Sequence, residues 1–237
     1  MSHEHNGYLR CAKQTISGNQ VTAVRWARIL RDLGHRVRIE ETQNFHNADL
    51  LIAIHAFRSA QAIDEWTNTY ADRPLVMLLA GTDIYRFQYS HADITLAAKR
   101  RAHRLVGLHD YVADDIPAQF SSKLRVIHQS ALPLARRRSP NTRTFDICVI
   151  GHLRYEKDPL RAARAAAQLP PTSKIRIVQL GKAHSEDYAR AAAGEMTVNP
   201  RYQWRGDVSR GAVRRALGRC QAMVMSSLDR RWRECGV

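Results

Sequence analysis

The amino-acid sequence predicts an α/β protein with two Rossmann-like, doubly wound domains. Short apolar runs, typical of strands buried in parallel sheets, alternate along the chain with segments of helical periodicity. This alternation stops at Pro133–Thr144 (PLARRRSPNTRT), which carries no apolar period, and then starts again. We therefore expect a first domain over residues 1–132, a linker over 133–144 and a second domain over 145–237, with a cleft between the domains for a small molecule.

The elements expected in the first domain follow one another in strand–helix order. A helix is expected from Val21 to Leu33, because its apolar residues recur at intervals of three and four and Gly34 follows as a cap. The other expected elements are strands over 35–41, 50–55, 74–80, 105–108 and 124–127 and helices over 58–70, 92–103 and 112–120. Residues 1–16 contain no recognisable strand, because YLRCAKQTI is too polar for a buried one.

The second domain opens with Asp146–Pro159, which reads DICVIGHLRYEKDP. The apolar run predicts a strand over 146–150 that ends at Gly151. A helix is expected from about Lys157, with Pro159 in its first turn, where the missing N–H costs nothing. The remaining elements are expected to be strands over 175–180, 202–204 and 222–225 and helices over 157–168, 186–193 and 210–217.

This opening stretch has the features of a phosphate-binding turn. The N–H groups and the dipole of a helix N-terminus favour an anion, and Arg154 and Lys157 are close enough in the sequence to reach it. The alternative interpretation is an ordinary connection between strand and helix with charged residues on its surface.

Length and composition indicate a globular protein. A chain of 237 residues can bury a sizeable core, and 44% hydrophobic with 25% charged residues is typical of a folded chain. No uncharged apolar run approaches the roughly 18 residues that span a bilayer, and the N-terminus lacks the apolar core of a signal peptide. We therefore expect a cytoplasmic protein with no transmembrane segment.

The four cysteines favour the same location. Cys11, Cys148, Cys220 and Cys235 share no CxxC spacing. Two of them lie in apolar, strand-like runs, so we expect buried thiols in a reducing compartment.

The formal net charge of +15 suits nucleic acid, an acidic membrane surface or phosphorylated substrates. The basic residues are spread along helical faces, apart from clusters at 99–101, 136–138 and 230–233, and no stacking aromatic residues alternate with them. Nucleic-acid binding is therefore a distant alternative, and no motif of a nucleic-acid-binding fold is present.

Four motifs together carry a family resemblance. They are SGNQVTAVRWARIL at the start of the first good helix, GTDIY after an apolar strand, GHLRYEKDP after the first strand of the second domain, and the later PRYQWRGDV. Over about residues 17–227 the chain resembles the two-domain GT-B glycosyltransferases of the family-four branch. Within that branch it is most similar to the bacterial selenosugar synthases of selenoneine biosynthesis. Each motif alone is weak, and the combination is what identifies the family.

The resemblance implies a donor site in the second domain. A UDP-sugar would bind there, and its diphosphate would contact Gly151, His152, Arg154 and Lys157. The family has an arginine directly after the glycine, whereas this chain has His152 at that position and Arg154 two residues later. Preorganised cations act where negative charge develops as the glycosidic bond breaks.

The resemblance also implies an acceptor site in the first domain, for a small anion such as selenophosphate. Gly18, Asn19 and Thr22 match a loop that faces the cleft, and Thr82 and Asp83 match a turn after the third strand of that domain. An ordinary helix cap and an ordinary turn are the alternative interpretations of these two groups.

Further candidates lie at strand ends, where ligands bind in open α/β sheets. They are His55, Gln129 and Ser130 in the first half of the chain and Gly181 in the second. A histidine in the position of His55 is also common as a purely structural residue. The sequence does not identify catalytic residues, the oligomeric state or the sugar that is transferred.

No cofactor or metal is expected. The sequence contains no DxD motif and no cluster of His, Cys and Asp with the spacing of a metal site. Arginine, lysine and helix dipoles would replace a divalent cation at the leaving group. A selenolate or oxyanion acceptor needs no strong base, so the lack of an evident catalytic dyad does not argue against an enzyme.

The second domain is expected to be incomplete. After Ser226 and Ser227 the family continues with a Glu-Gly-Gly-type loop and further strand–helix units, whereas this chain ends SSLDRRWRECGV. Back-translation of residues 231–237 with a shift of one nucleotide gives a sequence close to the expected run, so we hypothesise a frameshift near 228–231, against a natural short variant. The alternative function is accordingly an inactive fragment, or a non-catalytic nucleotide- or anion-binding remnant.

Overall fold

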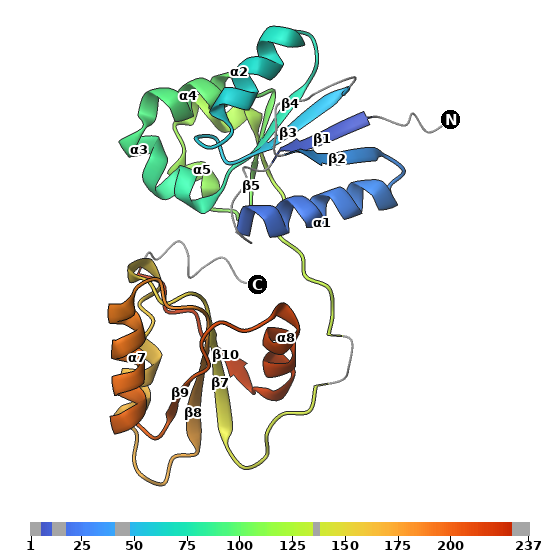
Figure 1. The fold of residues 1–237 in the computed structure, drawn as a ribbon. Helices are drawn as coiled ribbons and strands as arrows, with labels where there is room; N and C mark the ends of the chain where they lie inside the picture. Colours follow the sequence, from blue (N-terminus) through green and yellow to red (C-terminus); the bar gives the residue numbers. More distant parts are fainter. Residues whose placement is uncertain (1–5, 11–17, 41–47, 135–137, 229–237) are drawn as a thin grey trace. The chain divides into compact units, whose positions relative to one another are not determined.

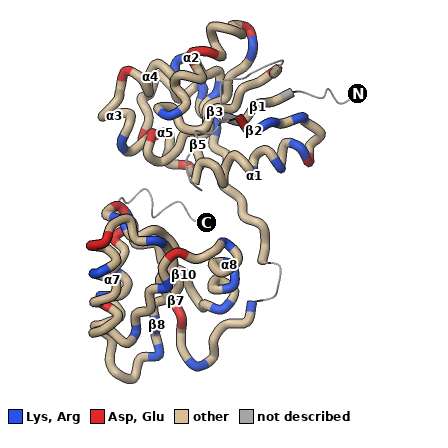
Figure 2. The backbone as a smooth tube through the Cα atoms, in the orientation of Figure 1, with Lys and Arg blue, Asp and Glu red and all other residues tan. Residues whose placement is uncertain are grey.

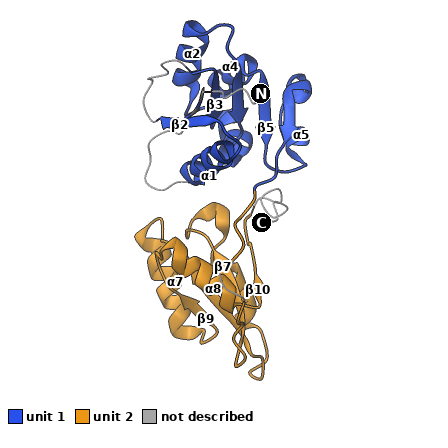
Figure 3. Cartoon of the chain, turned by 90° about the vertical axis from the view of Figure 1, so that its right-hand side faces the viewer, with its two compact units in different colours: residues 1–129 blue, residues 130–237 orange. Residues whose placement is uncertain are grey.

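The computed structural model describes residues 6–10, 18–40, 48–134 and 138–228. The chain divides into two compact units, Met1–Gln129 and Ser130–Val237 (Figure 1, Figure 3). The division precedes the segment 133–144 that was predicted as a linker. Within that segment, the backbone N–H groups of Ser139 and Asn141 donate to the carbonyl oxygens of Gly218 and Arg219, so its latter part packs on unit 2.

Unit 1 contains a six-stranded sheet in which every described pair of neighbouring strands runs parallel. Its strands are β1 (Asn6–Arg10), β2 (Arg36–Glu40), β3 (Leu50–Ile54), β4 (Leu75–Leu78), β5 (Arg104–Gly107) and β6 (Leu124–Val126), in the order β2-β1-β3-β4-β5-β6. The strand order reverses between β1 and β3. Ligands of open α/β sheets bind at such a reversal, beyond the carboxyl ends of the strands.

Helices cover both faces of this sheet. Helix α1 (Gly18–Asp32) packs the small residues Ala23 and Ala27 on one face. The core of the other face surrounds the fully buried Trp66. The elements that contribute to it include α2 (Ala60–Thr69), α4 (Ala92–Arg101), α5 (Val112–Asp115) and the 3₁₀ helix η2 (Ala118–Lys123). The continuous apolar runs of the sequence predicted strands that are buried on both faces, and the observed helices on both sides of the sheet agree with this.

Two predictions for unit 1 were wrong. Residues 1–16 contain the interior strand β1, which pairs with β2 on one side and β3 on the other. Backbone hydrogen bonds to two neighbours hold this strand, and its residue Leu9 is fully buried. A segment held mainly by its backbone need not show a strand pattern in its side chains. The helix predicted over 112–120 is interrupted, because Pro117 forces Ile116 into an extended conformation between α5 and η2.

Unit 2 contains a parallel four-stranded sheet in the order β10-β7-β8-β9. The strands are β7 (Phe145–Ile150), β8 (Ile175–Leu180), β9 (Tyr202–Trp204) and β10 (Ala222–Met223). Helices α6 (Arg161–Ala167) and α7 (Glu186–Val198) pack on the face that carries Val149 and Ile177. Helix α8 (Arg210–Arg219) packs on the face that carries Cys148 and Val178. The strand order reverses between β7 and β10.

The helix expected from Lys157 begins only at Arg161, which corrects the prediction. Residues Tyr155–Lys157 form a short 3₁₀ helix, η3, and Asp158 follows with a left-handed backbone (φ 40°). Pro159 disfavours the helical conformation in the residue before it, and aspartate tolerates the left-handed region. The helix dipole invoked for the phosphate site is therefore not available at Lys157. Strand β10 also ends at Met223 and not at Met225.

Cys148 and Cys220 are buried free thiols, as predicted for two of the four cysteines. Cys148 lies within β7, whereas Cys220 caps the end of α8 and is not part of a strand. Cys11 and Cys235 lie outside the described residues. Within the described residues, no helix has the length and apolarity needed to cross a bilayer.

Candidate functional site

In unit 2 the turns after β7 and β8 pack directly against each other. Gly151 donates its backbone N–H to Leu180 O at 2.9 Å, and Gly181 donates to Gly206 O at 2.9 Å. A Cβ atom on Gly181 (φ 145°) would lie only 2.1 Å from the carbonyl oxygen of Gly151. The structure therefore brings the two glycines that the sequence selected into one backbone-to-backbone contact, and only glycine fits at 181.

The chain continues this pairing beyond the glycines. Leu153 donates its N–H to Lys182 O at 2.9 Å, and His184 donates to Leu153 O at 3.0 Å. The rings of the exposed residues His152 and His184 consequently lie side by side, with centroids 5.7 Å apart. His152 thus lies next to the turn after β8. That turn contains His184, which the sequence did not indicate as a site residue.

Lys157 is held by the chain that follows β10. The Ser226 hydroxyl donates to the carbonyl oxygens of Lys157 (2.9 Å) and Asp158 (3.1 Å), and Lys157 Nζ donates to Ser227 Oγ at 3.4 Å. Both serines are buried. Sequence reasoning assigned neither a site role. Their position directly after a strand beside β7 is the signal that identifies them, because β7 and β10 flank the reversal of strand order.

A small cavity of about 10 Å³ lies behind Lys157, which is room for about one water molecule. It is lined by Gly151, Lys157, the two serines and Gln179, a residue that the sequence did not single out. Gln179 is 1% exposed, and within the described part of the chain its Oε1 atom accepts no hydrogen bond. The cavity is too small for a nucleotide, so any nucleotide would have to bind outside it.

Arg154 contributes the second cation of this turn. Its Nε atom is buried and has no hydrogen-bond partner among the described residues, although Glu156 Oε2 lies 3.8 Å away. Arg154 and Lys157 thus place two positive charges on a turn at the carboxyl end of a parallel strand. The basic turn predicted from the sequence exists, with Arg154 directly before η3 and Lys157 at its end.

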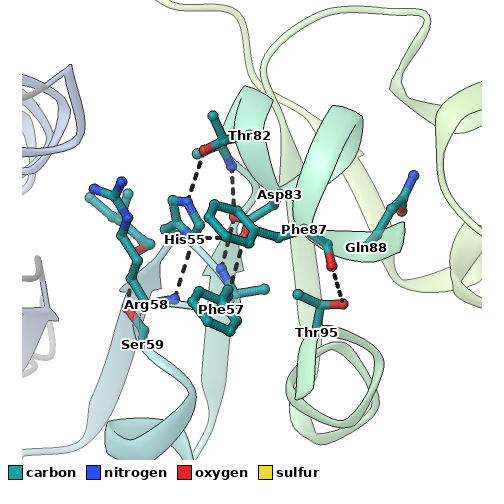
Figure 4. A network of polar contacts seen from close by, with 12 residues as sticks. His55, Phe57, Arg58, Ser59, Thr82, Asp83, Phe87, Gln88 and Thr95 are labelled. Atoms are coloured by element: carbon teal, nitrogen blue, oxygen red, sulfur yellow. Dashed lines mark hydrogen bonds and ion pairs between the residues drawn. The ribbon is translucent and has the colours of Figure 1, made fainter. Parts of the chain in front are cut away.

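In unit 1 the predicted residues His55, Thr82 and Asp83 form one polar network (Figure 4). His55 Nδ1 lies 2.7 Å from Asp83 Oδ1, and His55 Nε2 lies 2.9 Å from Thr82 Oγ1. The carboxylate only accepts, so Nδ1 carries a proton and donates it to Asp83. The N–H of Arg58 lies 3.4 Å from the same nitrogen and could donate to it only in the other tautomer, so the shorter contact to Asp83 decides the assignment. In neutral histidine Nε2 then accepts the hydroxyl proton of Thr82.

Asp83 is the centre of this network. Its Oδ2 atom accepts the backbone N–H groups of Ala56 (2.8 Å) and Ala80 (3.1 Å), and its Oδ1 atom accepts that of Phe57 (3.2 Å) as well as His55 Nδ1. The carboxyl group is fully buried. Four donors therefore compensate the loss of hydration of a buried negative charge.

His55 itself has a left-handed backbone, with φ of 78° directly after β3. Such a conformation costs about 1–3 kcal/mol in a residue other than glycine and persists where the surroundings fix it. Here the bonds to Thr82 and Asp83 fix it. The strain sits at the carboxyl end of a strand beside the reversal of strand order in unit 1, which is a position typical of binding sites.

A π-helix that the sequence did not predict positions Asp83 and an aromatic wall. It is η1 (Asp83–Phe87), followed by the short helix α3 (Gln88–Ser90). The ring of Phe87 stacks on Phe57 at 4.6 Å and meets His55 edge-on at 5.4 Å. π-helical turns are rare in proteins as a whole, and those that do occur are often found at functional sites.

A buried lysine lies beneath this turn. Lys99 is fully buried and donates to Gln88 Oε1 at 2.9 Å. Burial lowers the pKa of Lys99, and the negative charge of Asp83 opposes that shift.

The start of α1 and the end of unit 1 also come together. Gln129 Nε2 donates to Thr22 Oγ1 at 3.3 Å and Gln129 Oε1 accepts from Arg25 Nη1 at 2.8 Å, while Thr22 Oγ1 donates to Gly18 O at 3.0 Å. The predicted residues Gly18, Thr22 and Gln129 are therefore neighbours. Asn19 lies in the same turn of α1. Ser130 is exposed and belongs to unit 2.

The two units therefore offer different chemistry. The turn of unit 2 presents two cations and close-packed backbone, which suits an anion. The network of unit 1 presents a partly exposed hydroxyl, Thr82, backed by a histidine and a buried carboxylate. A hydroxyl in that arrangement can pass on or receive a hydrogen bond without a change in the backbone.

No protein-family model matches the chain, and no curated protein matches it by sequence. Solved structures match it by fold. The HepE protein of Anabaena, in complex with UDP and glucose, shares 16% identity over 94% of this chain and 74% of its own, with a TM-score of 0.71. The catalytic domain of starch synthase IV of Arabidopsis thaliana, bound to ADP and acarbose, shares 8% identity over 100% of this chain and 80% of its own, with a TM-score of 0.71.

A third similar structure has a different stated activity. The putative UDP-N-acetylglucosamine 2-epimerase of Listeria monocytogenes shares 9% identity over 93% of this chain and 74% of its own, with a TM-score of 0.58. These likenesses establish the fold, which is that of the GT-B glycosyltransferases, and confirm the predicted fold class. At these identities the fold alone does not assign a reaction.

Proposed function

We propose that the protein is a glycosyltransferase that takes its sugar from a UDP-sugar. The observation that carries the proposal is the turn of Gly151, Arg154 and Lys157, which places two cations at the reversal of strand order in unit 2. HepE, which has the same fold, was solved with UDP and with UDP-glucose, and this supports a uridine nucleotide as the donor. His152 and Gly181 belong to the same proposed donor site.

The charges of this turn suit the leaving group. When the bond between the sugar C1 and the diphosphate oxygen breaks, the electron pair stays on that oxygen, and the diphosphate gains negative charge. Arg154, with its incompletely bonded guanidinium group, and Lys157 would stabilise that charge in place of a metal. Lys157 is already oriented by Ser227, so little side-chain freedom would be lost on binding.

We further propose that the acceptor is a small anion, with selenophosphate the acceptor that the sequence resemblance favours. Its selenium would attack C1 of the sugar and form a C–Se bond while UDP leaves. An ionised acceptor has no proton to give up, so His55 would act as a positioning residue and not as a base. The contact between His55 Nε2 and Thr82 Oγ1 would fix the direction of the Thr82 side chain beside the acceptor.

The start of α1 is the second part of the proposed acceptor side. Gly18, Asn19 and Thr22 lie in its first turns, and Gln129 ties Thr22 and Arg25 to the end of unit 1. Arg25 would add a positive charge that favours an anionic acceptor. Ser130 directly follows this group in the sequence.

The test is an assay of the purified chain with UDP-glucose and UDP-N-acetylglucosamine, each with and without selenophosphate. Release of UDP is measured together with the mass of the sugar product. We expect UDP release that depends on selenophosphate and a product that contains selenium. UDP release without a selenium-containing product would reject the acceptor and keep the donor.

Two other outcomes separate the alternatives. Binding of UDP by calorimetry with no release of UDP from any donor would identify a non-catalytic nucleotide-binding remnant. Formation of an epimeric UDP-sugar without an acceptor would identify an epimerase, an activity stated for one protein of the same fold. Absence of UDP binding would overturn the proposal as a whole.

A further inference from the structure

Unit 2 contains a larger cavity that is separate from the donor turn. It has a volume of about 130 Å³ and lies between α8 and the face of β7 and β8 that α8 covers. Its polar lining consists of Asn141, Asp146, Arg176, Arg205 and Arg219. Three guanidinium groups therefore surround a cavity that contains a single carboxylate.

The carboxylate of Asp146 is already saturated. Arg176 donates to it through both Nε (3.0 Å) and Nη2 (2.7 Å), Thr144 Oγ1 donates at 2.6 Å, and Asn141 Nδ2 donates at 3.2 Å. Asp146 is also 5% exposed. The pair Asp146–Arg176 is thus a fixed, electrically neutral part of the wall, and Asp146 has no capacity left to neutralise a further arginine.

Arg205 and Arg219 remain uncompensated. Among the described residues, the guanidinium group of Arg205 donates to the neutral amide oxygen of Gln203, at 3.2 and 3.4 Å. In the described part of the chain no carboxylate lies within ion-pair distance of Arg205 or Arg219. Helix α8 adds the basic residues Arg210, Arg214 and Arg215 to the same region of unit 2 (Figure 2). The cavity therefore carries two surplus positive charges in a positive local field.

Size and position distinguish this cavity from a nucleotide site. Pockets that hold drug-sized ligands have volumes of about 300–1,000 Å³, so 130 Å³ suits a single tetrahedral oxoanion and a few waters. Asp146 precedes Gly151 by five residues along β7, which corresponds to about 16 Å of strand. An anion bound at the Asp146 end of the cavity would therefore not occupy the donor turn, whereas the backbone of Arg205 adjoins Gly206, whose carbonyl oxygen accepts the N–H of Gly181.

We propose that this cavity is a second anion site, which binds a phosphate-type oxoanion, either free or as the phosphoryl group of a small phosphate monoester. Arg205 and Arg219 would be its direct ligands, and guanidinium groups match such oxygens with paired N–H donors. Arg176 would line the floor of the site, held in place by Asp146. The proposal does not depend on the function proposed above.

The test is calorimetric titration of the full chain with inorganic phosphate and, separately, with glycerol 3-phosphate. All proteins carry Lys157→Ala, so that the donor turn contributes little. The variant Arg205→Gln with Arg219→Gln is compared with Arg210→Gln with Arg215→Gln. All four arginines are exposed, so the two variants lose the same charge from the surface, and only Arg205 and Arg219 line the cavity.

We expect the cavity pair to weaken phosphate binding by about tenfold or more and the control pair by about twofold or less. Binding of both ligands would assign the site to the phosphoryl group, and binding of phosphate alone would assign it to the free ion. Equal loss in the two double variants would show a response to net charge only and would overturn the proposal, as would absence of binding. A crystal soaked with tungstate should show anomalous density between Arg205 and Arg219.

Discussion

Among single residues, Asp83 has the most specific surroundings. Each of its carboxylate oxygens accepts two N–H donors, three from the backbone and one from His55. These bonds fix the ends of β3 and β4 against each other, and they hold the left-handed backbone of His55. One buried side chain therefore determines the local geometry of the proposed acceptor side.

Replacement of Asp83 by asparagine should destabilise unit 1 by about 3 kcal/mol. The amide nitrogen cannot accept a hydrogen bond, and in either orientation of the amide it would face two N–H donors. Urea unfolding of the variant measures the loss. Asp64→Asn is the matched control, because Asp64 forms a half-exposed ion pair with Arg101 and should change stability by less than about 1 kcal/mol. Equal effects of the two substitutions would contradict the role of Asp83.

Lys157 gives the sharpest test of the donor turn. Lys157→Ala removes a charge-assisted contact worth about 1.5–3 kcal/mol, so UDP affinity should fall by about ten- to a hundredfold. Calorimetric titration with UDP measures this change. Lys182→Ala is the control, because Lys182 is exposed on the neighbouring turn and acts only through screened charge. If Lys157→Ala binds UDP as tightly as the original chain, the turn is an ordinary connection between strand and helix.

At the scale of elements, the contact between the turns after β7 and β8 decides the shape of the donor site. The carbonyl group of Gly151 occupies the space that a Cβ atom on residue 181 would need. Two parallel strands thus place their loops closer together than side chains would permit. The position of His152, Arg154 and Lys157 depends on this contact.

Gly181→Ala should therefore lower both UDP affinity and the stability of unit 2, by about 1–3 kcal/mol in stability, because the methyl group must displace backbone atoms. Gly194→Ala is the matched control. Gly194 lies within α7, and a Cβ atom added there would meet no other atom within 4 Å, so alanine should stabilise the helix by about 0.5–1 kcal/mol. Denaturant unfolding and UDP titration of both variants measure these effects. Unchanged UDP affinity in Gly181→Ala would show that the contact is not needed for binding.

The cross-strand pair Asp146–Arg176 makes the stability of the pairing between β7 and β8 depend on pH. Burial alone would raise the pKa of Asp146, but hydrogen bonds from Arg176, Thr144 and Asn141 outweigh burial and lower it. A carboxyl whose pKa is lower in the folded than in the unfolded state stabilises the fold above its unfolded pKa of about 3.9, and this contribution is lost as the pH falls through the folded pKa.

In Asp146→Asn the free energy of unfolding should accordingly depend less on pH at acidic pH. The original chain should lose more stability than the variant between about pH 6 and pH 3, as measured by urea unfolding. Asp110→Asn, at an exposed residue paired with His128, serves as the control and should leave the profile almost unchanged. Parallel profiles for the original chain and Asp146→Asn would contradict the coupling.

At the scale of the whole molecule, the two units have separate hydrophobic cores. Trp66 is buried in the core of unit 1, and Trp204 packs against the core of unit 2. A chain with two cores need not unfold in one step. Each unit has its own sheet, with its own reversal of strand order, and its own helices.

We therefore expect two denaturant transitions, which the tryptophans can assign. Unit 1 contains Trp26 as well as Trp66, and both pack in its core. In Trp26→Phe with Trp66→Phe the fluorescence change of unit 1 should be lost, and in Trp204→Phe that of unit 2 should decrease. Asp83→Asn should then move only the transition of unit 1, and Gly181→Ala only that of unit 2. A single transition that both substitutions move equally would show that the units unfold together.

Much of the fold was predictable from local pattern. Strands β8 and β9 have the predicted bounds, α1 covers most of the predicted helix, and Gly34 has the positive φ of a helix cap. These features depend on residues that are neighbours in the sequence, so apolar spacing and glycine record them. The same reasoning placed His55, Gly151 and Gly181 at strand ends.

Local sequence thus specified the α/β class, the two runs of strands and helices and the turns that carry the candidate residues. The folded chain was needed to show that β1 is an interior strand, that η1 is a π-helix, and that α6 begins after Lys157. It also revealed the partners: Asp83 for His55, Ser227 for Lys157, and Gly151 for Gly181. The physical reason is that sheet pairing, close backbone packing and buried hydrogen bonds join residues far apart in the chain, and no local pattern in a single sequence specifies such pairs.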